Sequence, residues 1–246
     1  PLLSYLIDRL KKSKLIDQII IATSIIEEND KIENFCVKNN LACYRGSEND
    51  VLSRTTEALK SVKATHGVEV YGDCPLIDPE IIDYIINDFL EENDQYDFVG
   101  NNLKTTFPPG MEVEVFKFSA LSDANKLVND PIIREHGTLF IRQNPIKYKI
   151  KNIEAPIKWR RPDLEIEVDT EEDFHVISKI LENFNYSSSI SLQEIIKLLE
   201  HGNVSLDDSI KYYEQGVLLK TYCEDRLKKA ELKIKSVLRE TKDVDK

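Results

Sequence analysis

Two aspartates stand where the sequence could place a metal site. Asp73 lies in the stretch YGDCPLID, directly after the strand-like run VEV, and Asp169 ends the run EIEVD in front of a helix-like segment. The carboxyl ends of parallel strands meet at one edge of an α/β sheet, so both side chains could face the same crevice. Mg²⁺ typically binds one or two carboxylates together with water and substrate phosphates. Two plainer interpretations stay open: Asp73 could belong to an ordinary turn, and Asp169 could support the cap of the following helix.

Strand-like and helix-like segments alternate along the chain and must position these aspartates. Apolar residues spaced three and four apart predict helices, and short apolar or alternating runs predict strands. Helices are expected between the strands, including one over REHGTLFIRQNP (residues 134–145) and one that Thr170 caps. This order predicts an α/β sheet that is mostly parallel, with right-handed crossovers. The expected strands cover residues 18–22, 41–47, 68–73, 97–102, 111–118, 148–155 and 165–169.

Composition excludes several classes of protein. The 246 residues carry a formal net charge of −11, and such an acidic surface repels the phosphates of nucleic acids. No apolar run approaches the roughly 20 residues that a transmembrane helix needs. The four cysteines lack C-x-x-C spacing, which favours reduced thiols over disulfides or a zinc site. We therefore expect a cytoplasmic protein that binds neither membranes nor nucleic acid directly.

The last part of the sequence is organised differently. NYSSS (residues 185–189) is the best candidate linker, which predicts one domain over 1–189 and a second over 190–246. Residues 205–238 form a long helix-like run with a narrow apolar stripe that includes Leu219, Leu227 and Ile234. A long helix with such a stripe buries it against another helix, in the same chain or in a partner. The sequence therefore predicts a C-terminal helical hairpin or coiled coil and allows a homo-oligomer.

Five stretches together resemble one family of enzymes: YGDCPLID, RGSENDVLSR, FPPGMEVEVF, REHGTLFIR and VDTEEDF. Over residues 1–200 the sequence resembles the cytidylyltransferases of spore coat polysaccharide synthesis, which are relatives of the CMP-sugar synthetases. The resemblance implies a Rossmann-like nucleotide-diphospho-sugar transferase sheet. It also implies that Asp73 and Asp169 bind Mg²⁺, as the matching aspartates do in KDO-type synthetases. The implied reaction is attack of a sugar hydroxyl on the α-phosphate of CTP, which releases pyrophosphate and forms a CMP-sugar for polysaccharide synthesis.

The same resemblance assigns roles to further side chains. Arg45 and Arg54, in RGSENDVLSR, would lie near the nucleotide, although surface ion pairing would explain them equally well. Glu112 and Glu114, in GMEVEVF, would line the sugar side of the site together with Arg134. Glu114 alternates with valines, so it could instead lie on a solvated face of its strand. No residue is assigned as a catalytic base.

The sequence departs from this family at its start. The family opens with a strand and a loop of the type A-R-x-x-S-x-R-L-P-x-K, whose Arg and Lys bind the triphosphate. This motif does not occur in the 246 residues, which begin with a helix-like run. We interpret the chain as shortened at its N-terminus and expect a sheet that lacks its first, central strand. Transferase activity is therefore expected to be impaired.

From residue 199 onward, LEHGNVSLDDSIKYYEQGVLLK and the run that follows resemble the small subunit of exodeoxyribonuclease VII. That subunit is a non-catalytic helical hairpin that binds the nuclease large subunit. The resemblance implies that Leu219, Leu227 and Ile234 contact such a partner. The alternative function is thus a non-catalytic subunit, and a third is an α/β remnant without activity. Two families joined in one chain would be a natural fusion or a misassembled reading frame.

Overall fold

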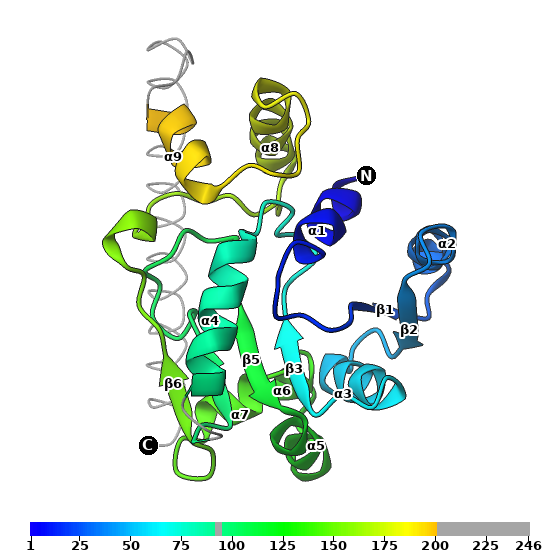
Figure 1. The fold of residues 1–246 in the computed structure, drawn as a ribbon. Coiled ribbons are helices and arrows are strands. Elements are labelled where there is room, and N and C mark those ends of the chain that lie inside the picture. The colour runs from blue at the N-terminus through cyan, green and yellow to red at the C-terminus, as the bar shows by residue number, and fades with distance from the viewer. Residues whose placement is uncertain (92–94, 201–246) are drawn as a thin grey trace, which may run out of the picture. The chain divides into compact units, whose positions relative to one another are not determined.

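The computed structural model describes residues 1–91 and 95–200 (Figure 1). The chain forms two units, Pro1–Ile196 and Lys197–Lys246. The domain boundary and the helical hairpin expected near the C-terminus stay predictions. The three residues expected to bind a partner there lie outside the described part of the chain: Leu219, Leu227 and Ile234.

The strands form two sheets. The first pairs β1 (Ile20–Ser24) in parallel with β2 (Ala42–Gly46). The second sheet has the order β3-β5-β4-β6 and consists of β3 (His66–Glu69), β4 (Phe98–Gly100), β5 (Glu114–Lys117) and β6 (Ile150–Asn152). In it β4 and β6 are parallel, whereas β5 runs antiparallel to both β3 and β4. The α/β architecture is confirmed. The expectation of a single, mostly parallel sheet is wrong in two respects, because β5 is antiparallel and because β1 and β3 belong to separate sheets.

The direction of β5 follows from the connection before it. Residues 101–113 return the chain from β4 without a crossover helix, and a return of this kind reverses the strand. Asn101 holds the connection closed: its Nδ2 donates to the Met111 carbonyl at 2.8 Å, and its Oδ1 accepts from the Val113 amide at 2.8 Å. Asn101 is buried, so these bonds satisfy polar groups that water does not reach.

Amphipathic helices cover the strands (Figure 1). α3 (Val51–Ser61) contacts β1 and β2, and α4 (Pro79–Glu91) contacts β4 and β5. No helix of the described residues is both long and apolar enough to cross a membrane. The other helices are α1 (Leu2–Leu10), α2 (Asp30–Lys38), α5 (Phe118–Leu127), α6 (Pro131–Arg134), α7 (Leu139–Gln143), α8 (Glu171–Asn183) and α9 (Leu192–Glu200), with 3₁₀ turns η1 (Glu27–Asn29) and η2 (Ile157–Trp159).

One hydrophobic cluster holds strands and helices of the second sheet together. It lies among β4, β5, α3, α5 and α7, and its residues have almost no solvent exposure. Burial of apolar surface of this kind is the main term that stabilises the fold. The larger members are Leu52, Phe98, Phe116, Leu121, Ile141 and Tyr148.

The helix expected over residues 134–145 is replaced by two short helices, α6 and α7. Besides the turn bonds from Glu135 and His136 back to α6, the residues between the two helices contact the second sheet. Gly137 lies against β3, where an added Cβ would be only 2.9 Å from a carboxyl oxygen of Glu69. The hydroxyl of Thr138, which is buried, donates to the Glu114 carboxylate on β5. These contacts, and not the helical pattern of the sequence, decide where α7 begins.

The strand expected over residues 165–169 is also wrong, because its backbone bonds go to two different loops. The Ile166 amide donates to the Pro109 carbonyl at 2.9 Å, and the Val168 amide donates to the Asp73 carbonyl at 2.9 Å. A strand needs a continuous ladder to one neighbour. The segment is therefore an extended loop that bonds to the two loops carrying Pro109 and Asp73.

A buried arginine ties α1 to the turn that precedes α4. Arg9 has no exposed surface; its Nε donates to the Ile77 carbonyl at 2.6 Å and its Nη1 to the Ser188 carbonyl at 3.3 Å. Burial lowers the pKa of Arg9 to about 10, and the charge of Asp78 opposes this. Asp78 in turn accepts from the Leu192 amide at 2.7 Å. The N-terminal helix, the turn and the segment before α9 are thereby joined.

Candidate metal and nucleotide site

The structure brings the loop of Asp169 to the turn that carries Asp73. The bond from the Val168 amide to the Asp73 carbonyl makes the two stretches of backbone neighbours. Asp73 lies beyond the carboxyl end of β3, as the sequence predicted, whereas Asp169 follows the extended loop and not a strand. Both aspartates are exposed. Two carboxylates that could bind a ligand therefore lie on adjacent loops.

A second group of side chains lies beside these loops. Ligand atoms of Cys74, Glu112 and Glu167 all lie within 4.8 Å of one another, and this set does not include Asp73 or Asp169. Cys74 is buried, and its thiol donates to Asp73 Oδ1 at 3.3 Å. The sequence resemblance placed Glu112 on the sugar side and assigned no role to Glu167. The signal for Glu167 was its spacing: it alternates with Asp169 in EIEVD.

Gly110 allows the two loops to approach each other. Its φ of +97° lies in a region that favours glycine, and an added Cβ would be 2.8 Å from backbone atoms of Ile166 and Glu167. Its amide also donates to Glu112 Oε2 at 2.7 Å. The glycine of the FPPG stretch thus sets Glu112 beside Glu167.

The carboxylates around Glu112 and Glu167 repel one another. Burial raises the pKa of Glu167 to about 7, and the charges of Glu112, Asp169 and Asp73 add to the effect. Burial also raises the pKa of Glu112, and it raises that of the Cys74 thiol strongly, with Asp73 contributing next. A bound divalent cation would relieve this repulsion, and carboxylate oxygens are the ligands that Mg²⁺ prefers. The donor set therefore fits a hard cation, while the buried protonated thiol fits it poorly.

Glu114, on the neighbouring strand β5, is buried and accepts several hydrogen bonds. Its exposure is 0%, so the alternative of a solvated strand face is wrong. Glu114 Oε1 accepts from the Tyr71 hydroxyl at 3.1 Å and from Asn102 Nδ2 at 2.5 Å, and Oε2 accepts from the Thr138 hydroxyl. Arg142 Nε lies 3.7 Å from Oε1. One carboxylate thus joins the end of β3, the loop after β4 and the start of α7.

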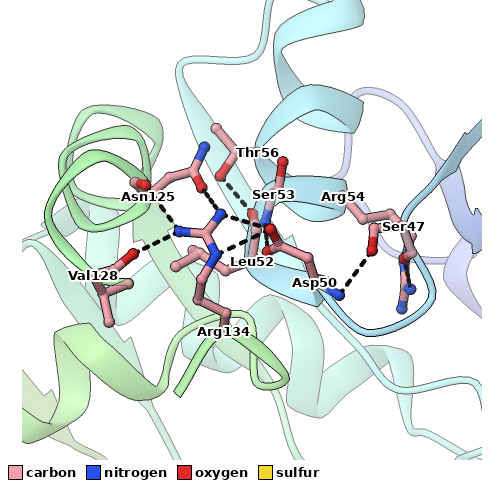
Figure 2. A network of polar contacts seen from close by, with 9 residues as sticks. All are labelled: Ser47, Asp50, Leu52, Ser53, Arg54, Thr56, Asn125, Val128 and Arg134. Carbon is pink, nitrogen blue, oxygen red and sulfur yellow. Dashed lines mark hydrogen bonds and ion pairs between the residues drawn. The ribbon is translucent and has the colours of Figure 1, made fainter. Parts of the chain in front are cut away.

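Arg134 binds protein groups that lie on two other helices (Figure 2). Its Nε and Nη2 donate to Asp50 Oδ2 at 3.0 and 2.8 Å, and its Nη1 donates to the carbonyls of Asn125 and Val128 at 3.0 and 2.8 Å. The other Asp50 oxygen caps α3 by accepting from the Ser53 amide at 2.9 Å. Contact with a sugar would require these bonds to break. The role of Arg134 on the sugar side stays a prediction.

The two arginines expected near the nucleotide differ in their surroundings. Arg45 Nη1 forms ion pairs with Asp30 and Glu33 at 2.6 and 2.7 Å, which is the ion-pair interpretation left open for it. Arg54 Nη1 donates to the Ser47 carbonyl at 2.6 Å. Its Nε is buried and has no hydrogen-bond partner among the described residues. Of the two, Arg54 is the better candidate to donate to a ligand.

A model of the family described as cytidylyltransferase matches residues 1–229. The chain belongs to the cytidylyltransferase family. The resemblance inferred from the five stretches is thereby confirmed at the level of the family. The match continues past the domain boundary expected after residue 189, into residues that the structure does not describe. It does not bear on the resemblance to the exodeoxyribonuclease subunit, which stays a prediction.

Relatives of this cytidylyltransferase are known from sequence and structure. It is 31% identical over 203 residues to the spore coat polysaccharide biosynthesis protein SpsF of Bacillus subtilis, across 80% of this chain and 82% of that protein. It is 33% identical over 223 residues to an uncharacterised protein of Methanocaldococcus jannaschii, across 91% and 87%.

Solved structures share its fold. A cytidylyltransferase of Leptospira borgpetersenii superimposes with a TM-score of 0.76 at 28% identity, across 81% of this chain and 83% of that one. The CMP:2-keto-3-deoxy-manno-octonic acid synthetase, solved with CTP, superimposes with a TM-score of 0.54 at 12% identity, across 75% and 88%. The second likeness concerns the fold alone.

Proposed function

We propose that the chain carries the site of a Mg²⁺-dependent transferase that moves a cytidylyl group from CTP to a sugar, for synthesis of a surface polysaccharide. The observation that carries the proposal is the group of carboxylates beyond the carboxyl end of β3 in a member of the cytidylyltransferase family. Two relatives support the choice of substrates: SpsF is named for polysaccharide biosynthesis, and the octonic acid synthetase was solved with CTP.

Each part of the site has a task in this proposal. Asp73 and Asp169 would hold Mg²⁺, which supplies charge neutralisation on the phosphates when it is bound. Glu112 and Glu167 lie close enough to Asp73 for its charge to raise their pKa values, and a bound cation would relieve this repulsion. Arg54 offers a donor to the nucleotide. Attack by the sugar hydroxyl depends on how these groups fix the phosphate, because phosphoryl chemistry relies chiefly on positioning and charge.

We further propose that turnover by these 246 residues is low. Phosphates of CTP need several positive groups, and the A-R-x-x-S-x-R-L-P-x-K motif of the family does not occur in the sequence. The division of the strands into two sheets agrees with a sheet that lacks a central strand. Addition of the family's strand and loop should therefore restore CTP-dependent release of pyrophosphate.

Calorimetry with Mg-CTP tests the proposal. The chain extended with the family's strand and loop should bind Mg-CTP at one site, and Asp73→Asn and Asp169→Asn should each weaken binding at least tenfold. Asp123→Asn is the matched control, because Asp123 lies on α5 and contacts Lys147 and Tyr148, which precede β6, rather than the residues of the site. Absence of Mg-CTP binding by the extended chain would refute the assignment.

The C-terminal segment supports a second proposal, based on its sequence motif alone. We infer that residues 190–246 bind the large subunit of an exodeoxyribonuclease VII through the stripe that contains Leu219, Leu227 and Ile234. The full chain should then co-purify with such a subunit, and Leu227→Asp should abolish the interaction because it places a charge in the stripe. If the Leu227→Asp variant co-purified with the large subunit as well as the wild type does, this inference would be wrong.

A further inference from the structure

Two thiols come together where α2 turns back into β2. Cys36 lies in the last turn of α2, and Cys43 is the second residue of β2. The helix packs against the strand (Figure 1). The connection between them is tight, because the Leu41 amide donates to the Cys36 carbonyl at 2.9 Å. Both cysteines are free in this structure, and we call them the thiol pair.

Arg45 shows which face of β2 Cys43 shares. Residues two apart on a strand point to the same side of the sheet. Arg45 Nη1 reaches α2, where it pairs with Asp30 and Glu33 at 2.6 and 2.7 Å. Cys43 lies two positions before Arg45 and therefore faces α2 as well. Since β2 runs back along α2, Cys43 meets the helix one turn beyond Glu33, which is where Cys36 lies.

The two thiols contact each other but differ in their access to solvent. A hydrogen bond joins their side chains. Cys36 is 0% exposed, whereas Cys43 is half-buried. Burial, and then the charge of Cys43, raise the pKa of the Cys36 thiol to about 12. A reagent in solution therefore reaches Cys43 first, with Cys36 behind it as a protonated second thiol.

The surroundings of the thiol pair favour disulfide chemistry over metal binding. A soft metal ion in a protein is typically held by four ligands. Among the described residues, the set of three ligand atoms close enough to hold a metal belongs to Cys74, Glu112 and Glu167, and neither member of the thiol pair is part of it. Two thiols in contact without further ligands suit a reaction that joins them.

We propose that Cys36 and Cys43 are a redox site that forms a reversible disulfide at the expense of a low-molecular-weight disulfide such as oxidised glutathione. The Cys43 thiolate attacks one sulfur of the small disulfide, so that a mixed disulfide forms and one small thiol leaves. Cys36 then gives up its proton and attacks the Cys43 sulfur, which releases the second small thiol. The thiol pair loses two electrons and two protons, and the small disulfide gains them.

The new bond would fix α2 to β2. It closes a loop of eight residues, from 36 to 43, and so removes conformational freedom from the unfolded chain. The factor by which folding favours the disulfide is also the factor by which the disulfide favours folding, because the two equilibria are linked. The proposal does not depend on CTP or on the metal site, so it can fail while the proposed transferase function stands, and the reverse.

Peptide mass spectrometry of the full chain tests the reaction. Trypsin cuts after Lys38 and Arg45, which places the two cysteines in separate peptides, IENFCVK and NNLACYR. The chain is equilibrated with reduced and oxidised glutathione at set ratios, and the remaining thiols are alkylated before digestion. The two peptides should then appear joined, two hydrogens lighter than their sum. Half-oxidation should need an at least tenfold lower proportion of oxidised glutathione in buffer than in concentrated urea, because the fold holds the thiols together.

Three variants test the order of the two steps. Cys36→Ser should trap glutathione on Cys43, whereas Cys43→Ser should leave the buried Cys36 unmodified. Cys223→Ser is the matched control and should form the disulfide as the wild type does. Circular dichroism shows whether each variant folds, and where one does not, the comparison of buffer with urea decides alone.

Four outcomes would overturn the proposal. These are absence of the joined peptides, half-oxidation at the same proportion in buffer and in urea, glutathione on Cys36 in folded Cys43→Ser, and a disulfide from either cysteine to Cys74 or Cys223 in the folded chain.

Discussion

Glu69 should make the stability of the protein depend on pH above neutrality. In the register of β3 and β5, Glu69 lies directly opposite Glu114, and like charges in such a pair repel. Glu114 is held as an acceptor by its hydrogen-bond donors. Burial, and then the charge of Glu114, raise the pKa of Glu69 to about 8, although Arg142 and Arg54 oppose this.

The sign of the effect follows from proton binding. Between pH 4.5 and 8 the folded protein holds a proton on Glu69 that the unfolded chain has released, so stability falls as pH rises through that range. One pKa unit corresponds to about 1.4 kcal/mol, and a folded pKa of about 8 implies a loss of about 2 kcal/mol between pH 6 and pH 8. Glu69→Gln removes the titrating group and should remove this loss.

Urea unfolding at pH 6, 7 and 8 measures the loss of stability that ionisation of Glu69 causes. The free energy of unfolding of the wild type, relative to that of Glu69→Gln, should fall by about 2 kcal/mol across this range. Glu154→Gln is a suitable control: Lys104 and Arg160 hold the pKa of Glu154 below its usual value, so that group does not titrate between pH 6 and 8. A constant difference between wild type and Glu69→Gln at all three values would refute the reasoning.

Three further substitutions test contacts around the site. Arg134→Met should cost about 2 kcal/mol of unfolding free energy in urea titration, because it leaves the partly buried Asp50 without its guanidinium partner. Adding Asp50→Asn to this variant should then cost little more. Gly110→Ala should lower the thermal midpoint, since it combines a positive φ with a clash against backbone, whereas Gly72→Ala meets open space and should not. Thr170→Ala should cost about 1 kcal/mol in urea titration through loss of the cap of α8, and an unchanged midpoint would count against the capping box.

Local patterns predicted the helices well and the site in part. The capping box at Thr170 and the start of α4 at Pro79 were readable, because both depend on residues close together in the chain. The position of Asp73 beyond a strand was predictable for the same reason, because a strand followed by a turn has a local signature; its role as a metal ligand stays a prediction.

The errors arose where distant contacts decide local structure. The alternation in EIEVD is the same for a strand and for an extended loop, and only the bonds of Ile166 and Val168 to separate loops distinguish them. The burial of Glu114 was hidden because its partners lie on three separate elements. Glu167 became visible as a site residue only when Gly110 brought its loop to Glu112.

The tether of Arg9 has a consequence for how the protein is made. Its guanidinium bonds to a carbonyl 179 positions away, at Ser188, and Asp78 bonds to an amide 114 positions away, at Leu192. A ribosome adds about 5–20 residues per second, so α1 leaves it many seconds before these partners exist. Until then Arg9 lacks its partner at Ser188, and Asp78 lacks its partner at Leu192. The turn that carries Asp73 therefore reaches its final form only when almost the whole first unit has been synthesised.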